Sequence, residues 1–260
     1  MSLDGRVALV TGGGRGLGRA LALALAEDGA AVAVGARSVH EVDAVAGELR
    51  EAGRSALAVS LDVADPASVA DAVRRVEAEL GGVDVLVNSA GVVWPVGLLH
   101  KVDVEEWEQS IAINLVGAAR CVRAVLPGML ERGWGRIVNL SSGAAVGSGM
   151  PSSSAYSVGK AGLDMLTANL GDELDGTGVQ IVGVRPGVVD TSMQDYMRSL
   201  PREQVGEVFY EKFHGMHERG ELIGPEPAIA LVLGLLDSER TGETWDVRDE
   251  KAEQLVRAGK

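Results

Sequence analysis

Residues 11–18 read Thr-Gly-Gly-Gly-Arg-Gly-Leu-Gly, and they join an apolar run at residues 6–11 to a helical pattern at residues 16–28. Glycines here let the backbone approach a phosphate, and a helix N-terminus offers free N–H groups and positive potential. The spacing Thr-Gly-x-x-x-Gly-x-Gly differs from the G-x-G-x-x-G fingerprint, and no P-loop Gly-Lys-Ser/Thr follows. The alternative is a tight turn that needs glycine for its backbone angles alone. The stretch therefore predicts a strand–turn–helix unit able to hold a dinucleotide pyrophosphate.

Apolar runs of strand length alternate with helical patterns along the rest of the chain. Strands are expected at residues 6–11, 31–35, 56–61, 83–87, 136–140, 179–184 and 244–247, and helices at 16–28, 39–52, 66–80, 104–130, 155–174 and 225–236. Such alternation predicts a single doubly wound α/β domain of Rossmann type over residues 1–260, with a seven-stranded, mostly parallel sheet and helices on both faces. Residues 190–222, called the lid segment below, break the rhythm and gather both phenylalanines and two of the three tyrosines, which favours a substrate lid.

Composition excludes several classes of partner. The 260 residues carry 24 Lys+Arg and 37 Asp+Glu, a formal net charge of −13, so nucleic acid and anionic membranes are not expected to bind. One cysteine, Cys121, allows no intrachain disulfide and fits a reducing compartment, the cytoplasm. Residues 1–10 lack the pattern of an export signal. The four histidines come with no cysteine or carboxylate cluster, so no metal site is expected.

The end of the second expected strand bears on the choice of cofactor. It reads Val34-Gly35-Ala36-Arg37-Ser38, with Ala36 where a carboxylate would bind the ribose of NAD. Arg37, together with Arg15 of the glycine turn, suits the 2′-phosphate of NADP. The alternative is that both arginines are ordinary surface residues and that the cofactor is NAD(H). The pattern favours NADP(H).

A tyrosine and a lysine stand four residues apart in Tyr156-Ser157-Val158-Gly159-Lys160, on one face of an expected helix. Free tyrosine titrates near pKa ~10, and a neighbouring ammonium should lower that pKa toward the range of general acid–base work. An isolated Tyr-x-x-x-Lys can equally be a pair on a helix surface. The pair is a catalytic candidate once other motifs accompany it.

With the glycine turn and the Tyr156–Lys160 motif together, the chain resembles the short-chain dehydrogenase/reductase family over nearly its whole length. Asn88-Ser89-Ala90-Gly91 is similar to the family's Asn-Asn-Ala-Gly, with Ser89 a departure, and Asn114 matches the family's helix asparagine. The resemblance implies cofactor contacts at Gly12, Arg15, Gly16, Leu17, Gly18, Arg37, Ser38, Asp62, Val63, Asn88, Ala90, Gly91, Tyr156, Lys160, Pro186, Gly187, Val189 and Thr191.

Two neighbouring residues, Ser141 and Ser142, are candidates for the catalytic serine of the family. It usually lies thirteen residues before the tyrosine, which is Gly143 here. The strand exit Asn139-Leu140-Ser141-Ser142 matches the family pattern in which the second serine is catalytic. One extra residue in the following loop accounts for the offset, so Ser142 is expected to act and Ser141 to be satisfied by nearby backbone.

The resemblance implies an NADPH-dependent carbonyl reductase with Asn114, Ser142, Tyr156 and Lys160 as its catalytic set. Tyr156 would protonate the carbonyl oxygen, Ser142 would hold it, Lys160 would tune Tyr156 and grip the nicotinamide ribose, and Asn114 would hold a water for proton resupply. A homo-oligomer, dimer or tetramer, is expected from the family, built on the helices at 104–130 and 155–174. Open alternatives are an NAD(P)-dependent secondary-alcohol dehydrogenase working oxidatively and a dinucleotide sensor without turnover.

A hydrophobic ketone or diketone is the expected substrate. Methionines adapt to irregular ligands, although each residue concerned can instead pack the lid segment against the body. A shorter, weaker similarity to the benzil reductase and sepiapterin reductase branch points the same way. The candidate pocket residues are Trp94, Val146, Met150, Met193, Tyr196 and Met197.

Overall fold

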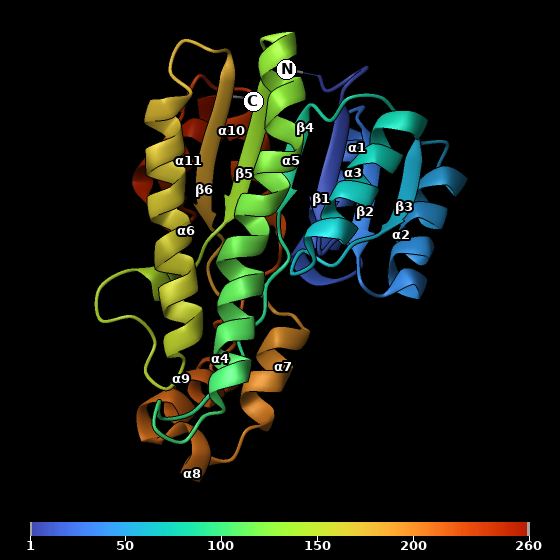
Figure 1. Cartoon of the computed structure of the whole chain (residues 1–260). Coiled ribbons are helices and arrows are strands. Elements are labelled where there is room, and N and C mark those ends of the chain that lie inside the picture. The colour runs from blue at the N-terminus through green and yellow to red at the C-terminus, as the bar shows by residue number, and fades with distance from the viewer. Residues whose placement is uncertain (1, 259–260) are drawn as a thin grey trace.

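The computed structural model describes residues 2–258 and contains one seven-stranded sheet in the order β3-β2-β1-β4-β5-β6-β7 (Figure 1). Every strand pair is parallel, so the expected doubly wound α/β fold is confirmed. The strands are β1 (Val7–Thr11), β2 (Ala31–Ala36), β3 (Ala56–Ser60), β4 (Val85–Asn88), β5 (Gly135–Leu140), β6 (Val179–Arg185) and β7 (Thr244–Asp246). The α-helices outside the lid segment are α1 (Gly16–Glu27), α2 (Val39–Glu51), α3 (Pro66–Glu79), α4 (Val104–Ile111), α5 (Gly117–Arg132), α6 (Ser154–Glu173), α10 (Glu226–Leu236) and α11 (Glu250–Ala258).

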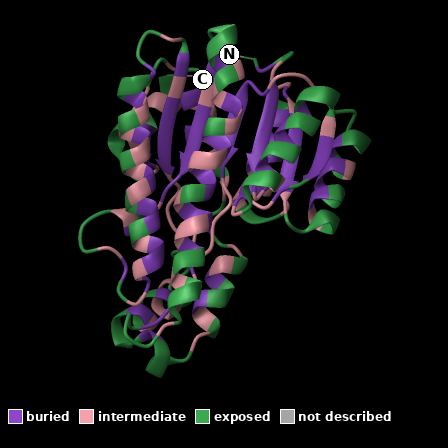
Figure 2. Ribbon diagram, in the orientation of Figure 1, coloured by how far each residue is buried: buried purple, intermediate pink, exposed green. Residues whose placement is uncertain are grey.

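Alternate residues of each strand enter two different cores. Ala8 and Val10 of β1 belong to the core under α1, α2 and α10, whereas Val7 and Leu9 belong to the core under α3 and α5. This is the period of two that a strand imposes on its side chains. Figure 2 shows the result, with buried strands between helices whose outer faces are exposed. Continuous apolar strands are the pattern expected of a parallel sheet covered on both sides.

One expected helix contains a π turn that was not expected, and one helix was not expected at all. The helix expected at residues 104–130 is α4 and α5 joined by a π-helical turn, η1 (Ala112–Val116). A further helix, α11, follows β7, where the sequence analysis expected none. Leu255 and Val256 of α11 pack against the core under α10, which explains why this short, charged segment is helical.

The stretch Val104–Arg132, which contains α4, η1 and α5, is long and apolar enough to cross a bilayer by length and composition alone. In the structure, α5 packs on β4 and β5, with Cys121, Val125 and Met129 buried in the core. Core helices pass the same test, so it is weak evidence for a membrane span.

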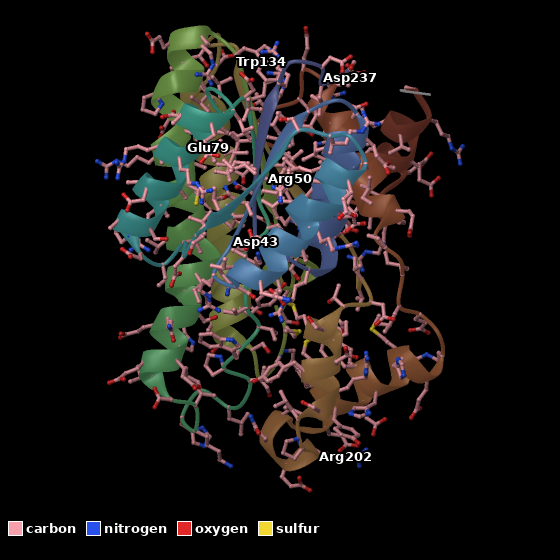
Figure 3. All side chains as sticks on the ribbon, turned by 90° about the vertical axis from the view of Figure 1, so that its right-hand side faces the viewer. Asp43, Arg50, Glu79, Trp134, Arg202 and Asp237 are labelled. Carbon is pink, nitrogen blue, oxygen red and sulfur yellow. The ribbon has the colours of Figure 1, made fainter. Side chains whose placement is uncertain are left out.

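The lid segment lies beyond the carboxyl ends of the strands, where Figure 1 shows it below the sheet. It forms α7 (Ser192–Ser199), α8 (Arg202–Val205) and α9 (Glu207–Glu218). The side view in Figure 3 places Arg202 of this segment and Trp134, which precedes β5, at opposite ends of the molecule. Phe209 and Phe213 of α9 anchor a third apolar cluster, which also contains Tyr156. The edge of the sheet at which α/β proteins bind ligands is therefore the edge that this segment covers.

Candidate active site

The glycine turn is fixed to the neighbouring strand exit at close range. Gly12 has φ +64°, and a Cβ there would lie 2.8 Å from the Cα of Ala90, so no other residue fits without displacing backbone. Thr11 reinforces the contact, because its Oγ1 accepts hydrogen bonds from the N–H groups of Ser89 and Ala90, both at 3.1 Å. The exits of β1 and β4 thus form one rigid surface.

The start of helix α1 suits a pyrophosphate. A Cβ at Gly18 would lie only 2.3 Å from the carbonyl oxygen of Gly12, so the turn closes tightly over the helix. No side chain caps α1, whereas Asp65 caps α3 and Asp103 caps α4 through hydrogen bonds to backbone N–H groups. The N-terminal N–H groups of α1 therefore lack a side-chain acceptor, which is the donor set that an anion at a helix N-terminus uses. The residues fit the phosphates of a dinucleotide.

The two arginines of the expected phosphate pocket have different surroundings. Arg37 is exposed and forms no ion pair with any residue in the described part of the chain. Arg15 is 71% exposed and lies 3.7 Å from a carboxylate oxygen of Glu41. Glu41 also packs against the glycine turn, since a Cβ at Gly14 would lie 2.8 Å from the Cβ of Glu41. This acid, which no local sequence pattern indicates, stands beside the expected pocket and competes for Arg15.

The loop after β6 faces the glycine turn. A Cβ at Gly16 would lie 3.4 Å from Thr191 Cγ2, so the glycine turn expected at the pyrophosphate and the loop after β6 lie close together. Gly187 has φ +76°, and a Cβ there would lie 2.8 Å from Ile223. Val189 pairs with Ile223 in an isolated parallel bridge, which ties this loop to the residue after the lid segment. Pro186 continues β6 into the same loop.

The expected adenine-side residues follow β2 and β3. Ser38 is exposed at the start of α2, and Asp62 is half-buried. The Asp62 carboxylate accepts a hydrogen bond from the N–H of Ala64 at 2.9 Å, which shapes the turn after β3. Val63 is buried, and a Cβ at Gly117 would lie 2.7 Å from its side chain. Leu17 packs at the edge of the core under α1.

Tyr156 and Lys160 project from the same face of α6 and are both buried. The ammonium of Lys160 donates a hydrogen bond of 2.7 Å to the carbonyl oxygen of Leu140, at the exit of β5, and lies 5.8 Å from the centre of the Tyr156 ring. A Cβ at Gly91 would lie 2.9 Å from Asn114 Oδ1 and 3.5 Å from Lys160 Nζ, so the glycine after β4 makes room for the Asn114 amide beside this ammonium. The exits of β4 and β5 therefore frame the pair.

The direction of the tyrosine pKa differs from the expectation. Burial raises the pKa of Tyr156, and hydrogen bonding with the Ser142 side chain only partly offsets that rise. Burial lowers the pKa of Lys160 to about 8, against a smaller opposing effect of the Asp164 carboxylate. Desolvation thus outweighs the hydrogen bond with Ser142 at Tyr156 and the charge of Asp164 at Lys160. A buried phenol with a raised pKa keeps its proton at neutral pH and can donate it.

The structure distinguishes the two serines. Ser142 is half-buried, interacts with Tyr156 and accepts a hydrogen bond from the N–H of Ala144 at 3.1 Å, which opens the 3₁₀ turn η2 (Gly143–Ala145). The hydroxyl of Ser141 is buried and has no hydrogen-bond partner among residues 2–258. The expectation that backbone satisfies Ser141 is therefore wrong. Ser142 is the serine at the tyrosine.

Asn114 lies in the π turn and clamps the strand β4 exit. Its amide donates to the carbonyl oxygen of Val92 at 2.7 Å and accepts from the N–H of Val92 at 3.0 Å. The amide also donates to Ser110 Oγ at 3.1 Å. These bonds hold the loop after Asn88 and Gly91 against the helix, which gives the interruption of the helix a physical reason. Asn114 and Lys160 thus both lie beside Gly91, at the exit of β4.

The third apolar cluster, around Phe209 and Phe213, is called the lid cluster below. It contains only part of the expected substrate pocket. Met150, Met193 and Met197 pack together with Tyr156, whereas Trp94 packs against the core under α5. Val146 and Tyr196 are exposed and belong to none of the clusters. Sequence reasoning missed the cluster members Val93, Val96, Val205, Phe209 and Phe213. The four-residue spacing of the two phenylalanines was the available signal, because it places them on one face of α9.

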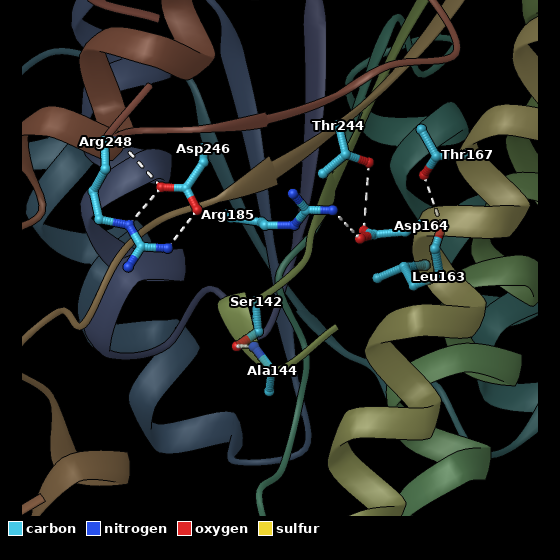
Figure 4. Close-up of polar contacts among 9 residues, drawn as sticks. All are labelled: Ser142, Ala144, Leu163, Asp164, Thr167, Arg185, Thr244, Asp246 and Arg248. Atoms are coloured by element: carbon cyan, nitrogen blue, oxygen red, sulfur yellow. Dashed lines mark hydrogen bonds and ion pairs between the residues drawn. The ribbon is translucent and has the colours of Figure 1, made fainter. Parts of the chain in front are cut away.

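Charged side chains cross the exits of β6 and β7, as Figure 4 shows. Arg185 donates to Asp164 at 2.6 Å, and Thr244 donates to the other oxygen of Asp164 at 3.4 Å. Asp246 receives two hydrogen bonds from the guanidinium of Arg248. The sequence analysis singled out none of these residues, because partners on separate elements leave no local pattern.

Within residues 2–258 no cluster of His, Cys, Asp or Glu could hold a metal ion. Burial raises the pKa of the Cys121 thiol to about 12, which makes it unreactive at neutral pH.

The chain is similar to several known proteins. A family profile described as short chain dehydrogenase matches residues 6–201. Cis-4-hydroxycyclohexanecarboxylate dehydrogenase of Sinomonas cyclohexanicum is 44% identical over 191 residues, 72% of this chain and 75% of that protein. The 3-oxoacyl-(acyl-carrier-protein) reductase FabG of Pseudomonas aeruginosa is 36% identical over 92% of both chains. The crystal structure of a gluconate 5-dehydrogenase from Burkholderia cenocepacia in complex with NADP and tartrate superposes with a TM-score of 0.82, 29% identity and coverage of 94% of both chains.

Proposed function

The chain belongs to the short-chain dehydrogenase/reductase family, and we propose that it is an NADPH-dependent carbonyl reductase that converts a hydrophobic ketone or diketone into a secondary alcohol. One observation carries the proposal: Tyr156, Lys160 and Ser142 meet at the exit of β5, beside the apolar cluster of the lid segment. An acid, a hydroxyl donor and an apolar surface for the substrate body are what reduction of a hydrophobic carbonyl requires.

Each residue of the site has a role that its surroundings support. The glycine turn and Arg37 would hold the dinucleotide, which, when bound, supplies the hydride for the carbonyl carbon. Tyr156 gives its phenolic proton to the carbonyl oxygen, and its raised pKa keeps that proton in place until the oxygen becomes basic. Ser142 donates a hydrogen bond to the same oxygen, which strengthens as negative charge develops there.

Lys160 and Asn114 position and resupply this acid. The Lys160 ammonium lies close enough to stabilise the phenolate that proton transfer leaves on Tyr156. A lysine with a pKa of about 8 exchanges protons readily near neutral pH, so it suits a relay that restores the tyrosine proton. Asn114 fixes the loop after β4, where Gly91 leaves room for the Asn114 amide beside the Lys160 ammonium.

NADP(H) is the proposed cofactor because Arg37 has no competing acid among residues 2–258 and Ala36 offers no carboxylate to the ribose. The NADP in the gluconate dehydrogenase relative supports the same choice. Replacement of Arg37 by aspartate should shift preference from NADPH to NADH, as read from kcat/KM with both cofactors. An unchanged preference would favour NAD(H).

A second candidate, oxidation of a secondary alcohol, has a specific observation in its favour. The name of the 44%-identical relative specifies a hydroxylated cyclohexanecarboxylate as the compound oxidised. Rates in both directions, with ketones plus NADPH and with the matching alcohols plus NADP⁺ or NAD⁺, decide between the two directions. NADPH binding without oxidation by any ketone in a broad panel would instead support a sensor.

The central experiment is a panel of ketones and diketones with NADPH consumption followed by absorbance. Hydrophobic ketones should be reduced, and removal of the apolar lid surface by Phe209→Ala should raise KM for the larger ones more than for acetone-sized ones. Because large and small ketones are compared with the same variant, any loss of folded protein affects both measurements equally. Equal loss for all sizes would contradict a substrate role of the lid cluster.

We also propose a homo-oligomer assembled through α5 and α6. An almost wholly apolar groove runs between these helices and is lined by Leu126, Leu130, Leu166 and Leu170. Leu130→Arg should dissociate the assembly in sedimentation, whereas Val208→Arg, at an exposed residue of α9, should leave it intact. A monomeric wild-type protein at micromolar concentration would contradict the proposal. The acidic charge and the single unreactive cysteine support a cytoplasmic location, without a nucleic-acid or membrane partner.

A further inference from the structure

The residue Arg248, directly after β7, carries a guanidinium that is fixed in place and yet accessible. Its Nε and Nη2 donate to the two carboxylate oxygens of Asp246 at 2.7 and 2.6 Å. The Asp246 side chain is 8% exposed, whereas that of Arg248 is 65% exposed. A buried carboxylate thus holds the inner edge of the guanidinium, as drawn in Figure 4, and little rotamer freedom remains to be lost on binding.

This guanidinium lies beside the catalytic serine. Arg248 Nη2 would be 3.4 Å from a Cβ at Gly143, the residue that follows Ser142. The preceding residue, Val247, donates its N–H to the carbonyl oxygen of Arg185 at 3.1 Å, and its side chain would be 3.3 Å from a Cβ at Gly187. Arg248 therefore stands where the serine turn and the loop after β6 meet, at the rim of the site.

Three of the five N–H donors of the Arg248 guanidinium remain unused. An arginine has one Nε–H and four Nη–H donors, and the pair with Asp246 takes one from Nε and one from Nη2. The outer edge, formed by Nη1 and Nη2, makes no hydrogen bond to another residue of the described chain. Asp249 is the other acid that acts on Arg248, and Arg185, which is itself paired with Asp164, acts on Asp246. An edge of this shape matches a second carboxylate in bidentate geometry.

We propose that Arg248 binds a carboxylate group of the substrate, so that the enzyme selects carbonyl compounds with an apolar body and an anionic end. The inference rests on the proposed carbonyl reduction and names the substrate class of that same site. Ser142 and Tyr156 hold the reacting oxygen, the lid cluster covers the apolar body, and Arg248 fixes the far end. A fixed guanidinium gives orientation as well as affinity, because two parallel hydrogen bonds allow a single approach.

The test compares a keto acid with its methyl ester, two substrates that differ only in charge at the far end. Wild-type kcat/KM should be higher for the acid, and Arg248→Gln should lower the acid-to-ester ratio by about 10- to 100-fold, the usual effect of losing a charge-assisted hydrogen bond. Arg248→Lys should retain part of the preference. Arg257→Gln, on the exposed surface of α11, is the matched control and should not change the ratio.

A purely structural role of Arg248 as partner of Asp246 predicts a different result. The variants would then lose activity on acid and ester alike, with an unchanged ratio, and that outcome overturns the inference. If the wild-type enzyme reduces neither compound, the proposed reduction itself is wrong. Calorimetric binding of a hydroxy acid and its amide to the wild type and to Arg248→Gln then decides the inference alone: a carboxylate preference lost in the variant supports it, and equal binding refutes it.

Discussion

Substitution of Gly18 by alanine tests whether the glycine turn needs glycine for the close approach of its backbone to the start of α1. The added Cβ would lie 2.3 Å from the carbonyl oxygen of Gly12, and real Cβ atoms essentially never approach closer than 3.0 Å. The carbonyl must therefore move by at least about 0.7 Å, and it belongs to a turn whose next contact is the backbone of Ala90. Overpacking of this kind costs about 1–3 kcal/mol.

The free-energy cost of Gly18→Ala should be divided between the stability of the protein and its affinity for NADPH. If it falls on the binding-competent turn alone, the Kd for NADPH rises roughly 5- to 150-fold. If the turn relaxes into the helix, the melting temperature falls instead, by about 2–4 °C per kcal/mol for a chain of this size. Fluorescence titration with NADPH measures the loss of affinity, and calorimetric melting of the same sample measures the loss of stability.

Gly47 provides the matched control. It also lies inside a helix, α2, but nothing lies within 4 Å of a Cβ there. Gly47→Ala should stabilise the protein by up to about 1 kcal/mol, through helix propensity, and leave NADPH affinity unchanged. Wild-type melting and wild-type NADPH affinity in Gly18→Ala would refute the reasoning about the turn.

Three further predictions concern charge. Glu41→Gln should free Arg15 and raise the kcat/KM ratio of NADPH over NADH roughly 1.5- to 5-fold, and a fall in that ratio would contradict competition for Arg15. Because burial lowers the pKa of Lys160 to about 8, kcat/KM for reduction should fall as pH rises through about 8, where the ammonium is lost; a profile flat to about pH 9.5 would oppose this assignment. Asp164→Asn, which breaks a pair 16–18% exposed, should cost about 1–3 kcal/mol in urea unfolding, whereas Asp71→Asn, in an exposed pair, should cost about 0.5 kcal/mol or less.

The sequence was most informative where function and fold depend on local backbone chemistry. The glycine turn between β1 and α1 could be predicted because its residues are consecutive and each glycine has a steric or conformational reason. Tyr156 and Lys160 share a face of α6 for the same kind of reason, namely the helical repeat. The alternation of apolar runs likewise predicted the parallel sheet, because continuous apolar strands need cover on both faces.

Features that depend on tertiary contacts could not be predicted. The π turn at Ala112–Val116 interrupts a regular apolar pattern, and the bonds that accompany it join Asn114 to Val92, 22 residues away. Glu41 reaches the glycine turn through packing of α2 rather than through nearness in sequence. The sign of the Tyr156 pKa shift depends on burial under the lid segment, which outweighs the hydrogen bond with Ser142.

The most direct test of the account is the replacement of Tyr156 by phenylalanine, with NADPH binding and ketone reduction measured on the same preparation. The ring and its packing in the lid cluster are kept, and only the proton donor is lost. NADPH should bind with nearly wild-type affinity, while kcat for the best ketone falls roughly 10²- to 10⁴-fold, the usual contribution of general acid catalysis. Reduction at the wild-type rate by Tyr156→Phe would contradict the assignment of Tyr156 as the acid, and with it the proposed site.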